Sequence, residues 1–166
     1  DHYNLLMALE DLMSFSKEVY VLFVGRSMDD GNRILSKWIE DLETPIKFKL
    51  LGEQSNITKV YSAMDIFCLH SRSEGFPNVL GEAMCMEIPC VATDVGDSAL
   101  LLGNSGLIVP PQNPQKLADG LLKILNKSKE KREIIGNLSR DRIKRRFSMK
   151  KIYSEYELLY ETILNK

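Results

Sequence analysis

The stretch Asp65-Ile-Phe-Cys-Leu-His70, with Ser73-Glu-Gly-Phe-Pro-Asn78-Val-Leu-Gly-Glu82-Ala-Met84 shortly after it, decides the fold of this chain. Its first part is an unbroken apolar run that predicts a short buried strand. Gly75 marks a turn, Pro77 has the backbone angle of a first helical position, and apolar residues then recur at helical spacing over 78–87. The stretch therefore predicts a strand, a loop and a helix in immediate succession.

Two carboxylates flank the start of that helix, Glu74 in the loop and Glu82 in the second turn. At about 100° per residue they lie about 80° apart in projection, so both are expected to border one cleft. Parallel α/β sheets bind ligands at this end of their strands. The free amides of Asn78, Val79 and Leu80 favour an anion such as a diphosphate. The spacing alone also fits two solvated glutamates near a helix start.

Outward from this stretch, strand-like runs alternate with amphipathic helical segments. The expected strands cover 19–25, 47–52, 66–70, 90–93 and 107–109. The expected helices cover 3–16, 32–42, 57–64, 78–87, 98–102, 114–125, 129–146 and 150–164. This alternation predicts an α/β fold, a Rossmann-like parallel sheet with helices on both faces. We expect one domain over 1–166, alternating through 1–127 and helical over 128–166.

Composition adds limits rather than a function. The chain has 166 residues, 44% of them hydrophobic, which is enough for a real core. No apolar run approaches the roughly 18 residues of a membrane span, and the charged, mixed start of the sequence is not expected to be a signal peptide, so a cytoplasmic protein is expected. Cys68, Cys85 and Cys90 are expected to be reduced core residues. Because no Asp-x-Asp pair or metal-ligand spacing occurs, we expect no metal and no cofactor.

The charge is unevenly distributed. Residues 127–151 hold 11 Lys or Arg and three acidic residues, while the whole chain has a net charge of −1. Such a basic stretch either contacts anionic lipid or forms a solvated helical face, and we favour the solvated face. Aromatic residues are few within it, which argues against nucleic acid as a partner.

Three segments resemble a known family, namely Glu74-Gly-Phe-Pro-Asn-Val-Leu-Gly-Glu82-Ala-Met, Pro89-Cys-Val-Ala-Thr-Asp94-Val-Gly96 and Gly106-Leu-Ile-Val-Pro-Pro-Gln-Asn-Pro114-Gln-Lys-Leu-Ala118. They look like the donor-binding half of family-4 retaining glycosyltransferases, the glycosyl transferases group 1. The segments 5–8, 21–25, 48–52 and 61–67 continue the same pattern upstream. The resemblance implies the C-terminal half of the two-domain GT-B architecture, which binds the nucleotide sugar, while the N-terminal half binds the acceptor.

The resemblance also implies roles for individual residues. Glu74 contacts hydroxyls of the donor sugar at the catalytic centre, and Glu82 accepts hydrogen bonds from the two ribose hydroxyls, a task that suits the paired oxygens of a carboxylate. Sugar and phosphates are contacted around Gly75, Phe76, Asn78 and Val79. Many relatives have glycine where this chain has Pro77, which lacks an amide donor. Glu74 and Glu82 could also be compared with the paired catalytic carboxylates of glycoside hydrolases, one of which is an acid and the other a nucleophile or base. The resemblance argues against that interpretation.

Further donor contacts are expected from two neighbouring strand ends. Arg26 follows the strand over 19–25 and is interpreted either as a nucleotide ligand or as a solvated turn residue. Glu53 lies in the segment 52–57, which either matches the family region that lines the base pocket or is an ordinary helix-capping loop. His70 is expected to form a cleft wall rather than to act as a base.

The opening of the chain departs from the family pattern. In the family, a strand that ends in Gly-Arg, with a lysine soon after it, precedes the first helix, and all three are missing here. We expect the chain to be a fragment that lacks the acceptor domain, two phosphate-binding cations and a strand between 19–25 and 66–70. Gly25-Arg26 is an alternative candidate for the Gly-Arg pair, although the spacing downstream of it fits poorly.

The predicted function is that of a donor-binding domain of a retaining hexosyltransferase. It would use a UDP- or GDP-sugar and a glycan or lipid-linked acceptor in polysaccharide or glycoconjugate biosynthesis. A lipid-linked acceptor would bring it to the inner face of the membrane, and the fragment alone is expected to be inactive. The rival hypothesis is a non-catalytic nucleotide-binding module. A nicotinamide-dependent dehydrogenase is disfavoured because no G-x-G-x-x-G follows a strand.

Overall fold

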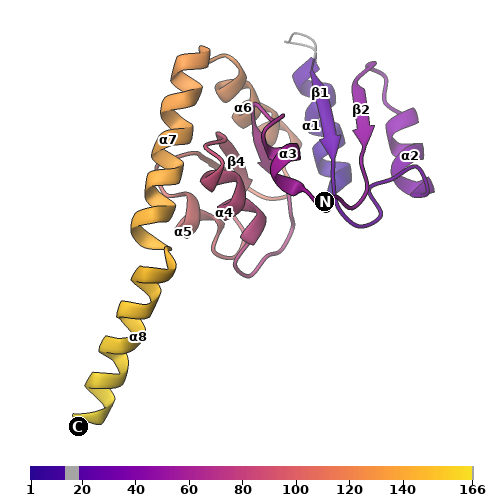
Figure 1. Cartoon of the computed structure of the whole chain (residues 1–166). Helices are drawn as coiled ribbons and strands as arrows, with labels where there is room; N and C mark the ends of the chain where they lie inside the picture. Colours follow the sequence, from indigo (N-terminus) through magenta and orange to yellow (C-terminus); the bar gives the residue numbers. More distant parts are fainter. Residues whose placement is uncertain (14–18, 166) are drawn as a thin grey trace.

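The computed structural model describes residues 1–13 and 19–165 (Figure 1). The strands are β1 (Tyr20–Phe23), β2 (Lys47–Leu50), β3 (Phe67–Leu69), β4 (Cys90–Thr93) and β5 (Leu107–Val109). The helices are α1 (His2–Met13), α2 (Arg33–Glu40), α3 (Ile57–Tyr61), α4 (Asn78–Cys85), α5 (Ser98–Leu102), α6 (Pro114–Leu125), α7 (Lys129–Arg146) and α8 (Met149–Leu164). Every predicted strand and helix is present, and most differ from prediction by a few residues at their ends. The last residues of the first predicted helix, 14–16, lie outside the described residues.

All strand pairs are parallel, which confirms the predicted sheet type. β1 pairs with β2, Tyr20 lying opposite Lys47, and a second sheet has the order β3-β4-β5. In that second sheet Phe67 lies opposite Cys90 and Val91 opposite Leu107. Within the described residues β1 and β3 share no ladder, so each has one edge without a partner strand. The sheet is therefore divided between β1 and β3.

Helices cover both faces of the sheet, as predicted. The side chains of β4 alternate between two hydrophobic cores, one on each face. Val91 packs with apolar residues of α1, α2 and α6, whereas Cys90 and Ala92 pack with residues of α3, α4 and α5. The four residues of β4 are all buried. A strand apolar on both faces is the signature of a parallel sheet sandwiched between helices.

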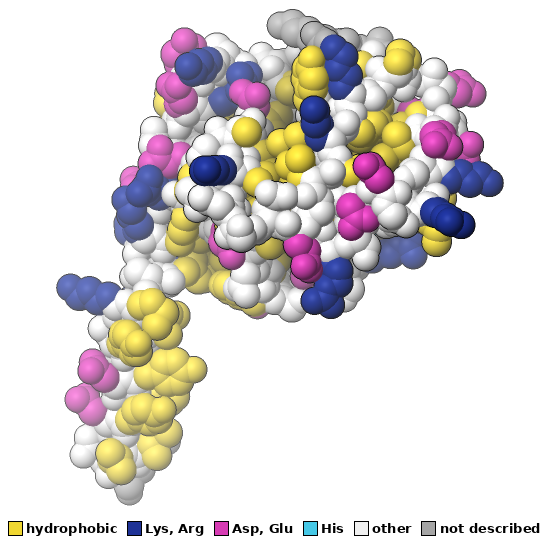
Figure 2. All heavy atoms as spheres, turned by 45° about the vertical axis from the view of Figure 1, so that its right-hand side comes forward, with side chains coloured by type: hydrophobic (Ala, Val, Ile, Leu, Met, Phe, Trp, Pro, Cys, Tyr) yellow, Lys and Arg dark blue, Asp and Glu magenta, His cyan; other side chains and the backbone are white. Residues whose placement is uncertain are grey.

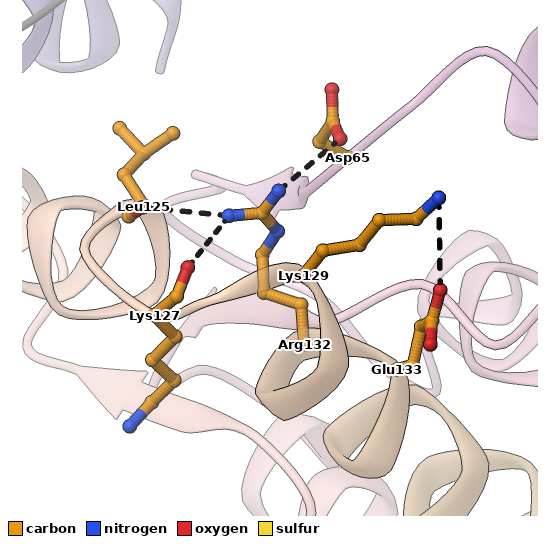
Figure 3. A network of polar contacts seen from close by, with 6 residues as sticks. All are labelled: Asp65, Leu125, Lys127, Lys129, Arg132 and Glu133. Atoms are coloured by element: carbon orange, nitrogen blue, oxygen red, sulfur yellow. Dashed lines mark hydrogen bonds and ion pairs between the residues drawn. The ribbon is translucent and has the colours of Figure 1, made fainter.

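Arg132 fastens α7 to the rest of the domain (Figure 3). Its guanidinium donates to the carbonyl oxygens of Leu125, the last residue of α6, at 3.5 Å and of Lys127 at 2.8 Å. The same group lies 3.7 Å from Asp65 Oδ1, just before β3. Only 23% of the Arg132 side chain is exposed. One side chain thus joins α7 to the end of the preceding helix and to the segment before β3, which is distant in sequence.

Replacing Arg132 with alanine is expected to lower the free energy of unfolding by about 1–3 kcal/mol, since hydrogen bonds to a charged group contribute about that much. Lys129→Ala is the matched control, because its ion pair with Glu133 is exposed and 4.0 Å long. Such a pair contributes about 0.3–0.5 kcal/mol. Urea unfolding of both variants measures the difference. Equal losses would show that Arg132 does not anchor α7.

Two more arginines of the basic stretch 127–151 also bind within the protein. Arg140 pairs with Glu87 at 2.7 Å. Arg142 donates to the carbonyl oxygens of Leu101 at 2.7 Å and Leu100 at 2.6 Å, at the end of α5. The interpretation of this stretch as a simple solvated face is therefore wrong for these arginines, because they satisfy carbonyl and carboxylate groups of neighbouring elements.

The last helix, α8, extends away from the body of the domain (Figure 1). None of its residues is buried. Its large exposed apolar residues are Met149, Tyr153, Tyr156, Leu158, Leu159, Tyr160, Ile163 and Leu164. Figure 2 shows apolar side chains gathered along one side of this helix. Among the described helices, none combines the length and apolar character needed to cross a membrane.

Candidate functional site: a cleft bordered by the start of helix α4

The start of α4 differs in detail from the sequence-based prediction. Pro77 is the residue before the helix, with φ −74°, rather than its first residue. The Leu80 amide is not free, because it donates to the Pro77 carbonyl at 3.0 Å in a tight first turn. Within the described residues, only the amides of Asn78 and Val79 at this helix start have no acceptor. The predicted anion site thus has two available amide donors instead of three.

Glu74 lies before α4 and is half-buried. The Ser71 hydroxyl donates to its Oε1 at 2.7 Å, and Thr93 Oγ1 donates to the Ser71 carbonyl at 2.8 Å. Ser71 follows β3 and Thr93 ends β4, so the carboxylate is supported from two adjacent strand ends. Ser71 was missed by the sequence analysis, although its place three residues before Glu74 at a strand end was a usable signal.

The loop that carries Glu74 packs tightly on the loop between β4 and α5. The Asp97 amide donates to the Gly75 carbonyl at 2.8 Å. Gly96 has φ +51°, and a Cβ at this position would overlap the carbonyl oxygens of Glu74 and Gly75. Only glycine allows this approach, because it has no side chain and tolerates positive φ.

Glu82 lies within α4 and is exposed. The hydroxyl of Tyr61, a buried residue of α3, donates to Glu82 Oε2 at 2.9 Å. Burial, followed by the hydrogen bond and the charge of Glu82, raises the pKa of Tyr61 well above its usual range. Tyr61 is therefore a neutral donor at pH 7. Tyr61 is the first residue of the family-like segment 61–67, but the sequence alone assigns it no role.

A cleft of about 770 Å³ brings together four of the predicted residues, Arg26, Glu53, Val79 and Glu82. Its lining includes Phe23 of β1 and Phe67 of β3. Its volume is in the range of pockets for nucleotide-sized ligands. Phe76 and Asn78 instead line an adjoining hollow of about 450 Å³, which Glu82 also borders. Glu74 and Gly75 are in the lining of neither hollow, although Gly75 is exposed and directly precedes Phe76.

Arg26 and Glu53 form an ion pair in the lining of this cleft. Arg26 Nε lies 3.4 Å from Glu53 Oε1, and both side chains are largely exposed. The two loops are joined by the Gly25 amide, which donates to the Gly52 carbonyl at 2.8 Å. An exposed pair of this kind contributes about 0–1 kcal/mol, so an anionic ligand can compete for the arginine.

His70 forms part of the cleft wall, as the sequence analysis expected. Its ring meets the ring of His2 edge-on, with centroids 5.0 Å apart. Burial, reinforced by the neighbouring His2, lowers the pKa of His70 to about 3. The imidazole is therefore neutral at pH 7.

The cysteines differ in environment. Cys90 is buried, Cys68 is partly buried, and burial raises the pKa of Cys68 to about 12. Cys85 is exposed, so its predicted place in the core is wrong. The reason is its position one turn after Glu82, on the side of α4 that faces the 450 Å³ hollow. All three thiols are free.

Comparison with known proteins assigns the family. The model of the family described as glycosyl transferases group 1 matches residues 2–127, so the chain belongs to this family. The chain is 26% identical over 166 residues to a capsular polysaccharide biosynthesis glycosyltransferase, CapM, of Staphylococcus aureus. That match covers 99% of this chain and 43% of the relative. The chain thus spans less than half the length of such relatives.

Solved structures of glycosyltransferases have the same fold as this chain. A glycosyltransferase from Rickettsia africae is 25% identical with a TM-score of 0.83, over 98% of this chain and 44% of that one. The C-terminal domain of a group 1 glycosyl transferase, LpcC, from Francisella tularensis has a TM-score of 0.73 at 22% identity, over 89% of this chain and 80% of that one. HepE of Anabaena, solved with UDP and glucose, has a TM-score of 0.76 at 24% identity, over 99% of this chain and 44% of that one. The fold is that of the C-terminal domain of GT-B glycosyltransferases.

Proposed function

We propose that this chain is the donor-binding domain of a retaining hexosyltransferase. The donor is a UDP- or GDP-sugar, and the acceptor is a glycan or a lipid-linked acceptor in polysaccharide or glycoconjugate biosynthesis. The observation that carries the proposal is that Glu82, Arg26 and Glu53 line the same cleft of about 770 Å³. The HepE complex with UDP supports the donor class, and the similarity to CapM, a capsular polysaccharide biosynthesis glycosyltransferase, supports the process.

The donor fits the cleft in one direction. The nucleobase lies against the loop that begins at Glu53, and the ribose hydroxyls donate to Glu82. The diphosphate then meets the two available amides, those of Asn78 and Val79, and draws Arg26 from Glu53. The sugar extends toward Glu74, beyond the start of α4. Negative charge thus meets the helix N-terminus, and hydroxyl donors meet carboxylate acceptors.

Transfer breaks the bond between the anomeric carbon and the diphosphate oxygen. The electron pair stays on the diphosphate, where the Asn78 and Val79 amides and Arg26 stabilise the new charge. The acceptor hydroxyl attacks from the face that the diphosphate leaves, which retains the configuration. Its proton passes to the departing phosphate oxygen. Glu74 holds the sugar in place while positive charge develops on its ring.

A further segment is proposed to complete the sheet. β1 and β3 each lack a partner on the edges that face one another. The start of α1 lies beside this division, since Asp1 pairs with Arg72, after β3, at 3.1 Å. A strand supplied from outside the described residues would join the two parts and deliver cations for the diphosphate at the same end. The acceptor domain is proposed to lie in the remaining length that the relatives have.

Calorimetric titration with UDP, GDP and NAD tests the donor class. UDP or GDP is expected to bind, and NAD is not. Binding of NAD alone would overturn the proposal. The natural full-length protein is then assayed for release of UDP or GDP from the sugar nucleotide. Nucleotide binding without any turnover of UDP- or GDP-hexoses would support the rival function, a non-catalytic nucleotide-binding module.

A further inference from the structure

Glu82 is exposed on α4, yet one of its two carboxylate oxygens already accepts a hydrogen bond from the buried Tyr61. The Tyr61 hydroxyl lies 2.9 Å from Glu82 Oε2 and 3.3 Å from the Val79 carbonyl oxygen. Within the described residues, no donor contacts Glu82 Oε1. Tyr61 therefore occupies one oxygen and leaves the other available. From this geometry we infer that Tyr61 is a positioning residue, which aims Glu82 at the ribose of the donor.

The Tyr61 side chain is itself held rigidly. Only 4% of the residue is exposed, and its ring packs against Phe67 of β3 with centroids 6.1 Å apart. It comes from α3, whose start is capped by the Asn56 side chain, which accepts from the Lys59 amide. A buried ring on a capped helix has little freedom to move. The phenol also has a single proton, so with its raised pKa it acts only as a donor toward the charged oxygen.

Fixing Glu82 in advance favours nucleotide binding. A free glutamate loses up to about 2 kcal/mol of side-chain rotational freedom when it is ordered. Tyr61 imposes that order before the nucleotide arrives, so less of the interaction with ribose is lost on binding. The contact with the Val79 carbonyl links the same hydroxyl to the first turn of α4, whose amides face the diphosphate.

This inference rests on the proposed function, in which Glu82 binds the ribose hydroxyls. It goes beyond that function because it assigns control over the ribose affinity to Tyr61, a buried residue of the cleft lining that acts through Glu82. The contrast with a purely structural tyrosine is sharp. A structural tyrosine supports every ligand equally, whereas a positioning residue acts only on ligands that carry ribose hydroxyls.

The test compares Tyr61→Phe with wild type in the natural full-length protein. Dissociation constants are measured for UDP and GDP and for their 2′,3′-dideoxy forms. For the nucleotide that wild type binds, Tyr61→Phe is expected to weaken binding about tenfold, the equivalent of one modest hydrogen bond. Binding of the dideoxy form is expected to stay within about twofold. Tyr153→Phe, on exposed α8, is the matched control and is expected to change neither value.

Two results would overturn the inference: no loss for the ribonucleotide, or equal losses for both ligands. Glu82→Ala separates this failure from failure of the proposed function. If Glu82→Ala lowers the affinity for the ribonucleotide alone and Tyr61→Phe does not lower it, Glu82 binds the ribose and Tyr61 does not position it. If Glu82→Ala does not discriminate between the ligands, both ideas fail. In the double variant, Tyr61→Phe is expected to add no loss to that of Glu82→Ala.

Discussion

Replacing Glu74 with alanine is expected to reduce sugar transfer by the natural full-length protein about a hundredfold or more. Glu74 is proposed to accept hydrogen bonds from the donor sugar, and charge-assisted bonds contribute about 1.5–3 kcal/mol each. Loss of orientation at the reacting carbon adds to this, since small misplacements slow reactions strongly. Affinity for bare UDP or GDP is expected to stay within about twofold. Initial rates with a saturating sugar nucleotide, together with nucleotide titration, measure both effects.

Asp119→Ala is the control for this variant. Asp119 is an exposed carboxylate on α6, paired with Lys116 at 3.3 Å and remote from α4. Its loss removes a negative charge of the same size and is expected to leave transfer within about twofold, as surface pairs contribute little. Normal transfer by Glu74→Ala would remove this residue from the catalytic centre.

Gly96→Ala is expected to damage both stability and transfer. A Cβ at Gly96 overlaps the backbone oxygens of Glu74 and Gly75, and neither is a flexible side-chain end that can turn aside. The loop that carries Glu74 must therefore shift. A residue forced into a rare backbone conformation costs about 1–3 kcal/mol, and a shift near 1 Å in catalytic groups costs about a hundredfold in rate. Urea unfolding and transfer rates measure the two losses.

Gly103→Ala separates strain from displacement of the loop. Gly103 has the same φ of +51°, but the atoms nearest to a Cβ there belong to the Arg142 side chain, which donates to the Leu100 and Leu101 carbonyls rather than to the glutamate loop. Gly103→Ala is expected to lose stability and to keep its transfer rate at temperatures where it is folded. If the two glycine variants lose transfer to the same extent, the packing of Gly96 does not position Glu74.

The sequence carried most of the architecture because its signals are local. β4 is buried throughout and was predicted with its observed bounds, since an unbroken apolar run is typical of a strand covered on both faces. The same holds for α6, where Asn113 caps the start and Pro114 occupies the first turn. The predicted division of the fold between an alternating part and a helical end follows from the same patterns.

The site was less predictable, because its contacts join residues that are distant in sequence. Tyr61 and Glu82 meet only when α3 and α4 pack together, and no pattern in either helix signals that pairing. Likewise, the approach of Gly96 to the Glu74 loop depends on how two strand ends lie side by side. The arginines of the stretch 127–151 show the same limit, since charge counts cannot reveal which side chains bind carbonyl oxygens.

The central claim is that Glu82 and Glu74 hold different parts of one nucleotide sugar. Calorimetric titration of the natural full-length protein with bare UDP and GDP, for wild type, Glu82→Ala and Glu74→Ala, tests it most directly. For the nucleotide that wild type binds, Glu82→Ala is expected to weaken binding about 10- to 100-fold, the equivalent of one or two hydrogen bonds to a charged group. Glu74→Ala is expected to bind the bare nucleotide within about twofold of wild type. Equal losses in the two variants would contradict the separate roles.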